Sequence, residues 1–333
     1  MPRTKTAASV VAVVGTGSIG CRHLRVLAQI PDVQPIAVPL RKSRSAELVS
    51  QGFVAVGSIA EARAEGATAC IIATDTNRHV SDAIEAMKSG MDILVEKPLA
   101  TDAAEARRLQ DAVPALGRRG FVGCVLRFSE SLNSFRSLLP LIGAVHSVRV
   151  ECQSYLPEWR PDRPYKESYS ARASEGGVLR DLIHEIDYTC WMFGWPEHVQ
   201  ADLDDGFRLG ISSEAQAHLT WRTPAGAHVS VCLDYLTRPA RRRVYAFGET
   251  GTLEWDGVQQ RITRHPFSGQ PEVHTSTQDR DAMLQAQDGA FIRSGITADE
   301  RLATLEDGVR ALAICDAARI AAAVARREVV RYS

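Results

Sequence analysis

Hydrophobic residues in the first third of the chain form short apolar runs that are separated by amphipathic segments. The runs predict buried strands, and the apolar spacing between them predicts helices. Alternating strands and helices are typical of a doubly wound parallel sheet, so we predict an α/β domain over residues 1–125. Strands are expected at 10–14, 33–40, 53–56, 69–73, 93–95 and 121–126, and helices at 61–65, 80–89 and 101–109, the last with Thr101 as its N-cap.

The pattern changes near residue 127, which places a second domain over residues 126–333. Strands in series between 199 and 262 predict a large, mostly antiparallel open sheet, so this domain is also of the α/β class. A strand is expected at 145–153 and helices at 131–139, at 178–193 up to Gly194, and at about 299–325.

A glycine turn follows the first strand and precedes a helix. Gly15, Gly17 and Gly20 form the pattern G-x-G-x-x-G, in which the first glycine permits the tight turn, the second lets the backbone approach a pyrophosphate, and the third lets the helix pack closely. The N–H groups at the start of the helix, including those of Ser18 and Ile19, then face the phosphates. A glycine-rich turn without a ligand is the alternative, but the position between a strand and a helix favours dinucleotide binding.

The end of the second strand indicates which nicotinamide cofactor is used. NAD-binding domains usually carry an acidic residue there, about 20 residues past the glycines. This chain instead has Arg41, with Ser43 and Arg44 close behind. A guanidinium is well suited to a 2′-phosphate. We therefore predict NADP as the preferred cofactor and NAD as the alternative; a solvated basic loop is the competing interpretation.

Composition narrows the class of protein. The chain has 333 residues, is 45% hydrophobic and 24% charged, and carries a formal net charge of −1. These values fit a soluble globular protein of two domains and favour neither a nucleic-acid nor a membrane partner. Seven cysteines without a C-x-x-C pair predict free thiols, and with no apolar leader or membrane span in the sequence we expect a cytoplasmic protein.

Several motifs together resemble the glucose–fructose oxidoreductase/inositol dehydrogenase family (Gfo/Idh/MocA). They are Glu96-Lys97-Pro98, the segment A-T-D-T-N-R-H at 73–79, the glycine-led segment G-G-V-L-R-D-L-I-H-E-I-D at 176–187, and G-E-T-G-T-L-E at 248–254. The resemblance implies a Rossmann domain followed by an α/β domain whose open sheet often packs against a second subunit, hence a homodimer or homotetramer. It also implies that Thr74, Asn77, His79, Glu96 and Lys97 bind the cofactor, and that the Lys97–Pro98 bond is cis.

The family pattern carries an Asp and a His on the glycine-led helix. Its commoner spacing is D-x-x-x-H, whereas Asp181 and His184 are three apart here and Arg180 stands four before His184. The shorter spacing resembles a branch of the family often seen beside bacterial surface-sugar and nonulosonic-acid genes. The role of Asp181 is therefore less firmly implied than that of His184.

Hydride transfer to or from a carbinol carbon needs a donor for the developing alkoxide and a proton acceptor. Lys97 follows a buried strand, at the sheet edge where ligands of open α/β sheets bind, and its ammonium can stabilise charge on the reacting oxygen. His184 is the candidate acid/base, because imidazole titrates near neutral pH. Asp181, three residues before His184, is expected to share a helix face with it and to orient the imidazole or contact a substrate hydroxyl. An exposed lysine and a core histidine are the alternatives for the first two residues, and Asp187 either assists or pairs with an arginine; no metal is expected.

An aromatic and basic segment from Tyr155 to Ser174 precedes the glycine pair at 176–177. Such a loop beside an active site suggests a polar, sugar-like substrate, and a surface loop or subunit contact is an equal alternative. The substrate-binding candidates are Lys97, Arg127, Trp159, Arg163, Tyr165, Arg180, Asp181 and His184.

These features predict an NAD(P)-dependent oxidoreductase that acts on a carbinol or keto group of a sugar, amino sugar, sugar acid or cyclitol. One alternative is a relative that cleaves glycosides by transient oxidation with tightly held NAD. Another is a non-catalytic dinucleotide sensor, against which the joint presence of Lys97, Asp181 and His184 argues.

Overall fold

The chain folds into two compact units, each described here by itself. A computed structural model describes residues 9–161, 163–297 and 299–332. The first unit contains residues up to 100 together with 104–128 and 279–308; the second contains 101–103, 129–278 and 309–333. The chain therefore changes units near residue 128, and it returns to the first unit for residues 279–308, a return that the sequence pattern did not predict.

The first unit is built on a seven-stranded sheet with the order β15-β6-β5-β4-β1-β2-β3. All pairs are parallel except β15 with β6, and the order matches the doubly wound arrangement predicted from the sequence. Its central strands are almost wholly apolar because helices cover both faces of such sheets. The strands are β1 (Ser9–Val14), β2 (Val33–Val38), β3 (Val54–Ala55), β4 (Ala69–Ile72), β5 (Asp92–Glu96), β6 (Gly120–Gly123) and β15 (Ala303–Thr304).

The helices of the first unit follow the predicted alternation with three differences. Helix α2 (Ser43–Ser50) was not predicted. The helix predicted at 101–109 begins at Ala103 and continues to Leu116, so Thr101 is not its N-cap. A further helix, α9, was not predicted. The helices are α1 (Ser18–Leu27), α2 (Ser43–Ser50), α3 (Ile59–Ala64), α4 (His79–Lys88), α5 (Ala103–Leu116, whose first residue belongs to the second unit) and α9 (Arg280–Arg293), with short 3₁₀ turns η1 (Thr76–Arg78) and η2 (Val125–Phe128).

The second unit contains a nine-stranded sheet with the order β14-β13-β12-β11-β7-β10-β9-β8-β16. Only β7 and β10 pair in parallel, so the sheet is mostly antiparallel, as predicted. Side chains alternate between buried and exposed along β9 and β10, which leaves one face polar. The strands are β7 (Val145–Gln153), β8 (His198–Asp204), β9 (Gln216–Arg222), β10 (His228–Asp234), β11 (Arg241–Gly248), β12 (Gly251–Asp256), β13 (Arg261–Pro266), β14 (Glu272–Thr275) and β16 (Glu328–Val329).

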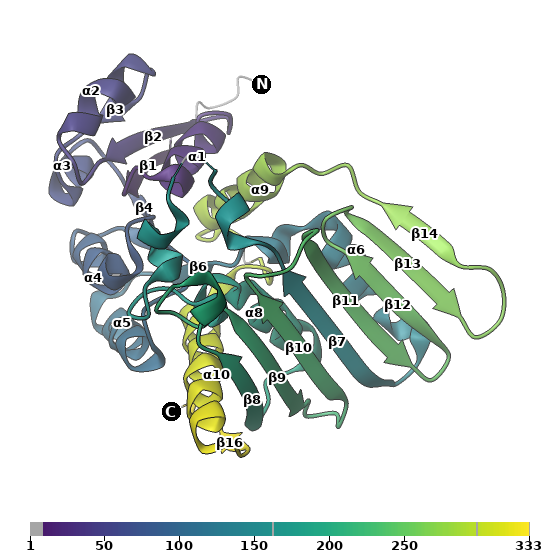
Figure 1. The fold of residues 1–333 in the computed structure, drawn as a ribbon. Coiled ribbons are helices and arrows are strands. Elements are labelled where there is room, and N and C mark those ends of the chain that lie inside the picture. The colour runs from purple at the N-terminus through teal and green to yellow at the C-terminus, as the bar shows by residue number, and fades with distance from the viewer. Residues whose placement is uncertain (1–8, 162, 298, 333) are drawn as a thin grey trace, which may run out of the picture. The chain divides into compact units, whose positions relative to one another are not determined.

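The buried face of this sheet carries helices, with α8 against β7 and α6 against β12 (Figure 1). The last helix runs from Leu305 to Val324, because residues 303–304 form β15 instead of a first helical turn. In the part of the chain that the structure describes, no helix is long and apolar enough to cross a membrane. The helices are α6 (Glu130–Leu138), α7 (Val178–Asp181), α8 (Ile183–Phe193) and α10 (Leu305–Val324), with 3₁₀ turns η3 (Leu139–Ile142), η4 (Leu156–Glu158), η5 (Tyr165–Glu167), η6 (Tyr169–Ala171) and η7 (Phe207–Leu209).

The helix predicted over 178–193 is interrupted. Leu182, with φ −101° and ψ 27°, separates α7 from α8. The i, i+3 argument assumes one continuous helix, whereas Asp181 and His184 lie on separate helices, so the expected shared face stays a prediction without that support.

Candidate active site

The glycine turn sits between the carboxyl ends of β1 and β4, where the strand order of the sheet reverses. Gly15 has φ +87°, and a Cβ there would lie 2.5 Å from the Ala73 carbonyl oxygen. A Cβ on Gly20 would lie 1.9 Å from the Gly15 oxygen. Gly17 is different, because a Cβ there would meet nothing within 4 Å. The backbone at Gly17 therefore borders open space at the start of α1, with Ser18 exposed and Ile19 half-buried, as pyrophosphate binding requires.

One of the basic residues after β2, Arg44, contacts this turn. Arg44 donates from Nη2 to the Thr16 carbonyl oxygen at 3.2 Å, and its Nη1 pairs with Glu47 at 2.7 Å. Arg44 thus braces the turn. Arg41 and Ser43 are exposed, which leaves their side chains accessible to a ligand.

His79 joins two loops at the carboxyl edge of the sheet. Its Nδ1 lies 2.9 Å from the Pro98 carbonyl oxygen, and its Nε2 lies 3.1 Å from that of Thr74. Burial lowers the pKa of His79. The neutral ring therefore donates to only one of these two carbonyl oxygens, while Asn77 is exposed and Thr74 is half-buried.

Lys97 directly follows β5 and is half-buried, and its bond to Pro98 is cis, as expected. Glu96 accepts the Lys97 backbone N–H through Oε2 at 3.3 Å. Its other oxygen, Oε1, is 3.1 Å from His23 Nε2, and His23 Nδ1 is 2.7 Å from Asp288 Oδ2. Sequence reasoning missed both His23 and Asp288; the only available signal was the position of His23 in the helix after the glycines.

Arg127 lies in η2 and is 2% exposed. Its Nη1 is 3.2 Å from Asp307 Oδ2, within the first unit. This ion pair of a buried arginine contributes to the fold of the first unit. The predicted substrate contact of Arg127 remains a prediction.

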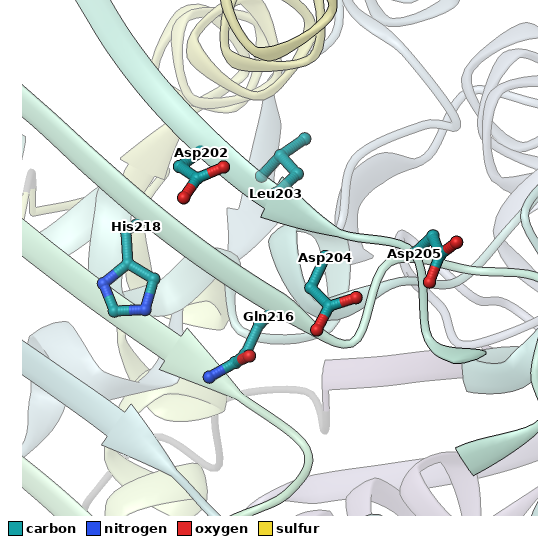
Figure 2. Close-up of a pocket in the computed structure, with 6 residues that line it drawn as sticks. All are labelled: Asp202, Leu203, Asp204, Asp205, Gln216 and His218. Carbon is teal, nitrogen blue, oxygen red and sulfur yellow. The ribbon is translucent and has the colours of Figure 1, made fainter. Parts of the chain in front are cut away.

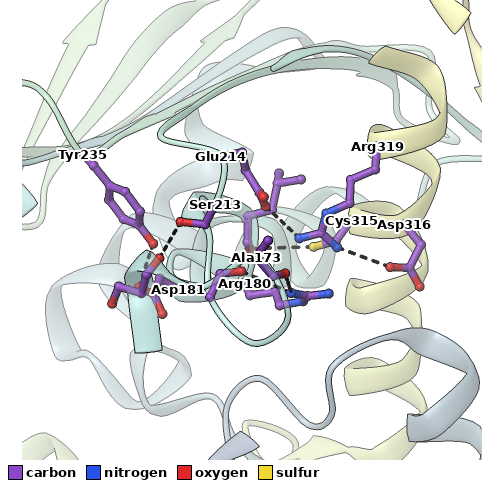
Figure 3. Close-up of polar contacts among 12 residues, drawn as sticks. Ala173, Arg180, Asp181, Ser213, Glu214, Tyr235, Cys315, Asp316 and Arg319 are labelled. Atoms are coloured by element: carbon purple, nitrogen blue, oxygen red, sulfur yellow. Dashed lines mark hydrogen bonds and ion pairs between the residues drawn. The ribbon is translucent and has the colours of Figure 1, made fainter. Parts of the chain in front are cut away.

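In the second unit, Asp181 and His184 are both buried, with 4% and 8% exposure. The Tyr235 hydroxyl donates to Asp181 Oδ2 at 2.7 Å (Figure 3). Burial, then the charge of Asp181, raises the pKa of Tyr235 well above its ordinary value, so this hydroxyl stays protonated and donates. Tyr235, 54 residues from Asp181, was not among the predicted site residues.

Removing the Tyr235 hydroxyl tests this arrangement. Tyr235→Phe is expected to lower the free energy of unfolding by about 1–3 kcal/mol, because a buried carboxylate oxygen loses a donor. Urea unfolding measures the loss. Tyr245→Phe, at a half-buried hydroxyl on β11, is the control and is expected to cost less than about 1 kcal/mol. If the two variants lose equal free energy of unfolding, the hydrogen bond from Tyr235 to Asp181 contributes no more to stability than that of a half-buried hydroxyl.

Arg180 was predicted to bind substrate, but the structure gives its guanidinium backbone partners. Nη1 donates to the carbonyl oxygens of Ala173 and Gly176, at 3.0 and 3.2 Å (Figure 3). Next to it, Gly177 has φ +95°, and a Cβ there would lie 2.5 Å from the Glu214 carboxylate, which pairs with Arg319. The glycine pair and Arg180 therefore shape the loop that leads into α7.

The aromatic and basic segment is partly tied to the second unit. The Tyr165 hydroxyl donates to the Leu209 carbonyl oxygen at 2.9 Å. Trp159 donates to Ser154 Oγ at 2.9 Å and meets the Tyr235 ring edge to face at 5.3 Å. Arg163 is exposed. Trp159 thus links this segment to the tyrosine that holds Asp181, whereas Arg163 and Tyr165 are not brought to that carboxylate by any contact described.

A surface hollow on β8 and β9 is lined by none of the predicted site residues (Figure 2). The hollow is lined by Asp202, Leu203, Asp204, Asp205, Gln216 and His218.

All seven cysteines lie in the described residues and are free thiols, as predicted.

Two family models match the chain. Residues 10–124 match the model described as "Oxidoreductase family, NAD-binding Rossmann fold". Residues 141–254 match the model described as "GFO/IDH/MocA C-terminal domain". The fold and the glycine turn thus define a protein of the oxidoreductase class with an NAD-binding Rossmann domain. The chain belongs to the Gfo/Idh/MocA family, which confirms the resemblance.

Two curated relatives illustrate the similarity. The chain is 34% identical to an inositol 2-dehydrogenase of Renibacterium salmoninarum over 184 residues, 53% of this chain and 52% of the relative. It is 32% identical to a 4-carboxy-2-hydroxymuconate-6-semialdehyde dehydrogenase of a Sphingobium strain over 222 residues, 65% of this chain and 69% of the relative. The chain thus spans about half the length of inositol dehydrogenases such as the first.

Solved structures share the whole fold. A levoglucosan dehydrogenase in complex with NADH and L-sorbose superposes with a TM-score of 0.85 at 20% identity, covering 97% of this chain and 99% of the other. The WlbA dehydrogenase of Bordetella pertussis, in complex with NADH and UDP-GlcNAcA, has a TM-score of 0.83 at 21% identity and covers 99% of both chains. At these identities the likeness establishes the fold.

Proposed function

We propose that the protein is an NAD(P)-dependent oxidoreductase that transfers a hydride between the nicotinamide and a carbinol or keto carbon of a sugar, amino sugar, sugar acid or cyclitol. The observation that carries this proposal is the first unit itself: open space at Gly17, beside the start of α1, and Lys97 at the carboxyl edge of the same parallel sheet. Names of relatives, among them inositol and levoglucosan dehydrogenases, support the substrate class.

The residues present fit a dinucleotide. Gly15, Gly17 and Gly20, with the N–H groups of Ser18 and Ile19, would hold the pyrophosphate, and the loops of Thr74, Asn77 and Glu96 would border the nicotinamide half. When bound, the nicotinamide ring supplies or accepts the hydride. Every other step falls to the side chains of the protein.

Lys97 is proposed to hydrogen-bond the reacting oxygen and to stabilise the negative charge that develops on it. His184 is proposed to accept or return the hydroxyl proton, with Asp181 as its partner or as a ligand for a neighbouring substrate hydroxyl. The proton leaves the carbinol oxygen as the hydride leaves its carbon. Lys97 and His184 are therefore both proposed to act on the same oxygen, one by stabilising its charge and the other by taking its proton.

NADP is the proposed preferred cofactor, with Arg41 and Ser43 binding the 2′-phosphate. Arg41→Asp is expected to shift the ratio of the NADPH and NADH dissociation constants toward NADH by about 10-fold or more, because a carboxylate repels the phosphate and accepts from ribose hydroxyls. Fluorescence titration measures both constants. Arg118→Asp changes the net charge equally at another exposed arginine and serves as the control. An unchanged ratio contradicts the 2′-phosphate role.

The function is tested first by titrating the purified protein with NADPH and NADH, after any bound cofactor has been identified. Binding followed by oxidation of the reduced cofactor with a keto sugar or keto cyclitol supports the proposal. A nicotinamide that co-purifies and shows no net turnover favours the transient-redox alternative. Binding without turnover on any such compound favours a sensor, and absence of binding overturns the proposal.

We also propose a homodimer or homotetramer in a reducing cytoplasm. The polar outer face of the nine-stranded sheet, with Tyr245 and Phe247 stacked at 6.3 Å, and seven free thiols support these two points. Light scattering on the eluting protein gives the mass.

A further inference from the structure

The first unit holds a buried cluster of three ionisable side chains from three elements. His23 on α1 and Asp288 on α9 are fully buried, and Glu96 at the end of β5 is 8% exposed. The His23 ring lies between the two carboxylates, 2.7 Å from Asp288 Oδ2 through Nδ1 and 3.1 Å from Glu96 Oε1 through Nε2. The neighbouring Gln287 lies 3.4 Å from the second Asp288 oxygen.

The cluster favours a charged imidazole. A neutral ring has a single N–H, whereas both ring nitrogens of His23 face carboxylate oxygens, so only imidazolium donates to both. Burial would lower the pKa of His23, but Asp288, and then Glu96, outweigh it and raise that pKa to about 10. His23 therefore carries a positive charge at neutral pH.

Glu96 connects the charge on His23 to the loop that begins with Lys97 and Pro98 after β5, called here the lysine loop. While Oε1 faces His23, Oε2 accepts the backbone N–H of Lys97 at 3.3 Å. Gly123 on the adjacent β6 leaves the space for the carboxylate, because a Cβ at that position would lie 2.8 Å from Glu96 Oε1. The carboxylate is thus held by His23 on α1 and by the backbone N–H of Lys97, in space left free by Gly123 on β6.

We propose that His23 is a positioning residue, which acts through Glu96 to fix the backbone at Lys97 relative to the helix that begins at the glycine turn. Asp288 keeps the imidazole charged and fixes its orientation. The inference rests on the proposed function, because the placement of Lys97 matters for turnover only if Lys97 contacts the substrate. Loss of the positive charge on His23 is expected to make the backbone at Lys97 more mobile. The backbone at the start of α1, where the phosphates are proposed to bind, is expected to keep its structure.

The first test needs no turnover. Histidine-ring NMR of the free protein, with the His23 signal assigned by its loss in His23→Gln, is expected to show a doubly protonated ring at pH 8. In Asp288→Asn the ring is expected to titrate at least about one pH unit lower than in wild type. A neutral His23 ring at pH 8 in the wild type overturns the inference.

Hydrogen exchange tests the mechanical link. In His23→Gln the Lys97 amide is expected to exchange about 10-fold faster or more, since its acceptor Glu96 is no longer held, while amides in the core of β1 keep their rates. If hydrogen exchange becomes faster throughout His23→Gln, the variant is unfolding. The same measurement is then made on Gly123→Ala, which disturbs Glu96 and keeps the charges of all three side chains. Unchanged Lys97 exchange in a folded variant contradicts the proposal.

Kinetics then connects the cluster to turnover. His23→Gln is expected to lower kcat by about 10-fold or more with little change in the dinucleotide dissociation constant. Asp288→Asn should move the alkaline limit of kcat to lower pH, which a merely structural role would not do. His274→Gln, at an exposed histidine of β14, is the control. If the wild type turns over no sugar or cyclitol, the proposed function fails, whereas the NMR and exchange results still decide the role of His23.

Discussion

Lys97→Ala is expected to lower kcat by about 10³-fold or more while the dinucleotide dissociation constant stays close to that of the wild type. Removal of a donor to a developing alkoxide typically costs about 10²–10³ in rate, and a lost proton-transfer group costs a similar factor. Lys97 follows β5, whereas the phosphate-binding backbone follows β1, so the two effects are separable. Single-turnover reduction and a fluorescence titration measure them independently.

Lys88→Ala serves as the matched control, because Lys88 is an exposed lysine at the end of α4. Lys97→Met keeps most of the length of the side chain but removes the charged, hydrogen-bonding ammonium group, so it should resemble the alanine variant. Loss of both turnover and cofactor binding, or of neither, would contradict the role assigned to Lys97.

Gly17→Ala is expected to weaken dinucleotide binding by about 100-fold or more, with a thermal midpoint equal to or slightly above that of the wild type. The added methyl group enters the open space where the pyrophosphate is proposed to lie, and each hydrogen bond lost to a charged group costs about 1.5–3 kcal/mol. The fold itself tolerates alanine, because Gly17 has φ −73° and no neighbour within 4 Å of a Cβ.

Gly20→Ala provides the contrast. Its Cβ would lie 1.9 Å from the Gly15 carbonyl oxygen, so this variant is expected to lose at least about 2 kcal/mol of stability whether or not cofactor is present. Calorimetry and isothermal titration distinguish the two variants. Undiminished affinity in Gly17→Ala would exclude the glycine turn as the phosphate site.

Elements with a regular apolar period were predictable from the sequence. The strand at 145–153 matches β7 at both ends, because its side chains alternate between core and surface. Helix α9 was missed, since Gln287 and Asp288 occupy buried positions and break the apolar stripe. The interruption at Leu182 was equally invisible, for no glycine or proline marks it.

The residues of the candidate site likewise fall into those that were predictable from local sequence spacing and those that were not. The glycine turn and the lysine loop depend on local spacing and were found where predicted. The partners of their side chains depend on contacts across the chain: Asp288 is 265 residues from His23, and Tyr235 is 54 residues from Asp181. Local patterns carry no information about such pairs, and a predicted substrate ligand such as Arg180 therefore proved to be held by the backbone of its own loop.

The return of residues 279–308 to the first unit has a consequence for biosynthesis. These residues supply β15, which covers the edge of β6, and α9, which carries the carboxylate facing His23. A nascent chain that has emerged only to residue 128 therefore has an uncovered strand edge at β6, and its His23 ring lacks the Asp288 carboxylate. The Rossmann unit therefore reaches its final form only after residues 279–308, and with them most of the second unit, have left the ribosome.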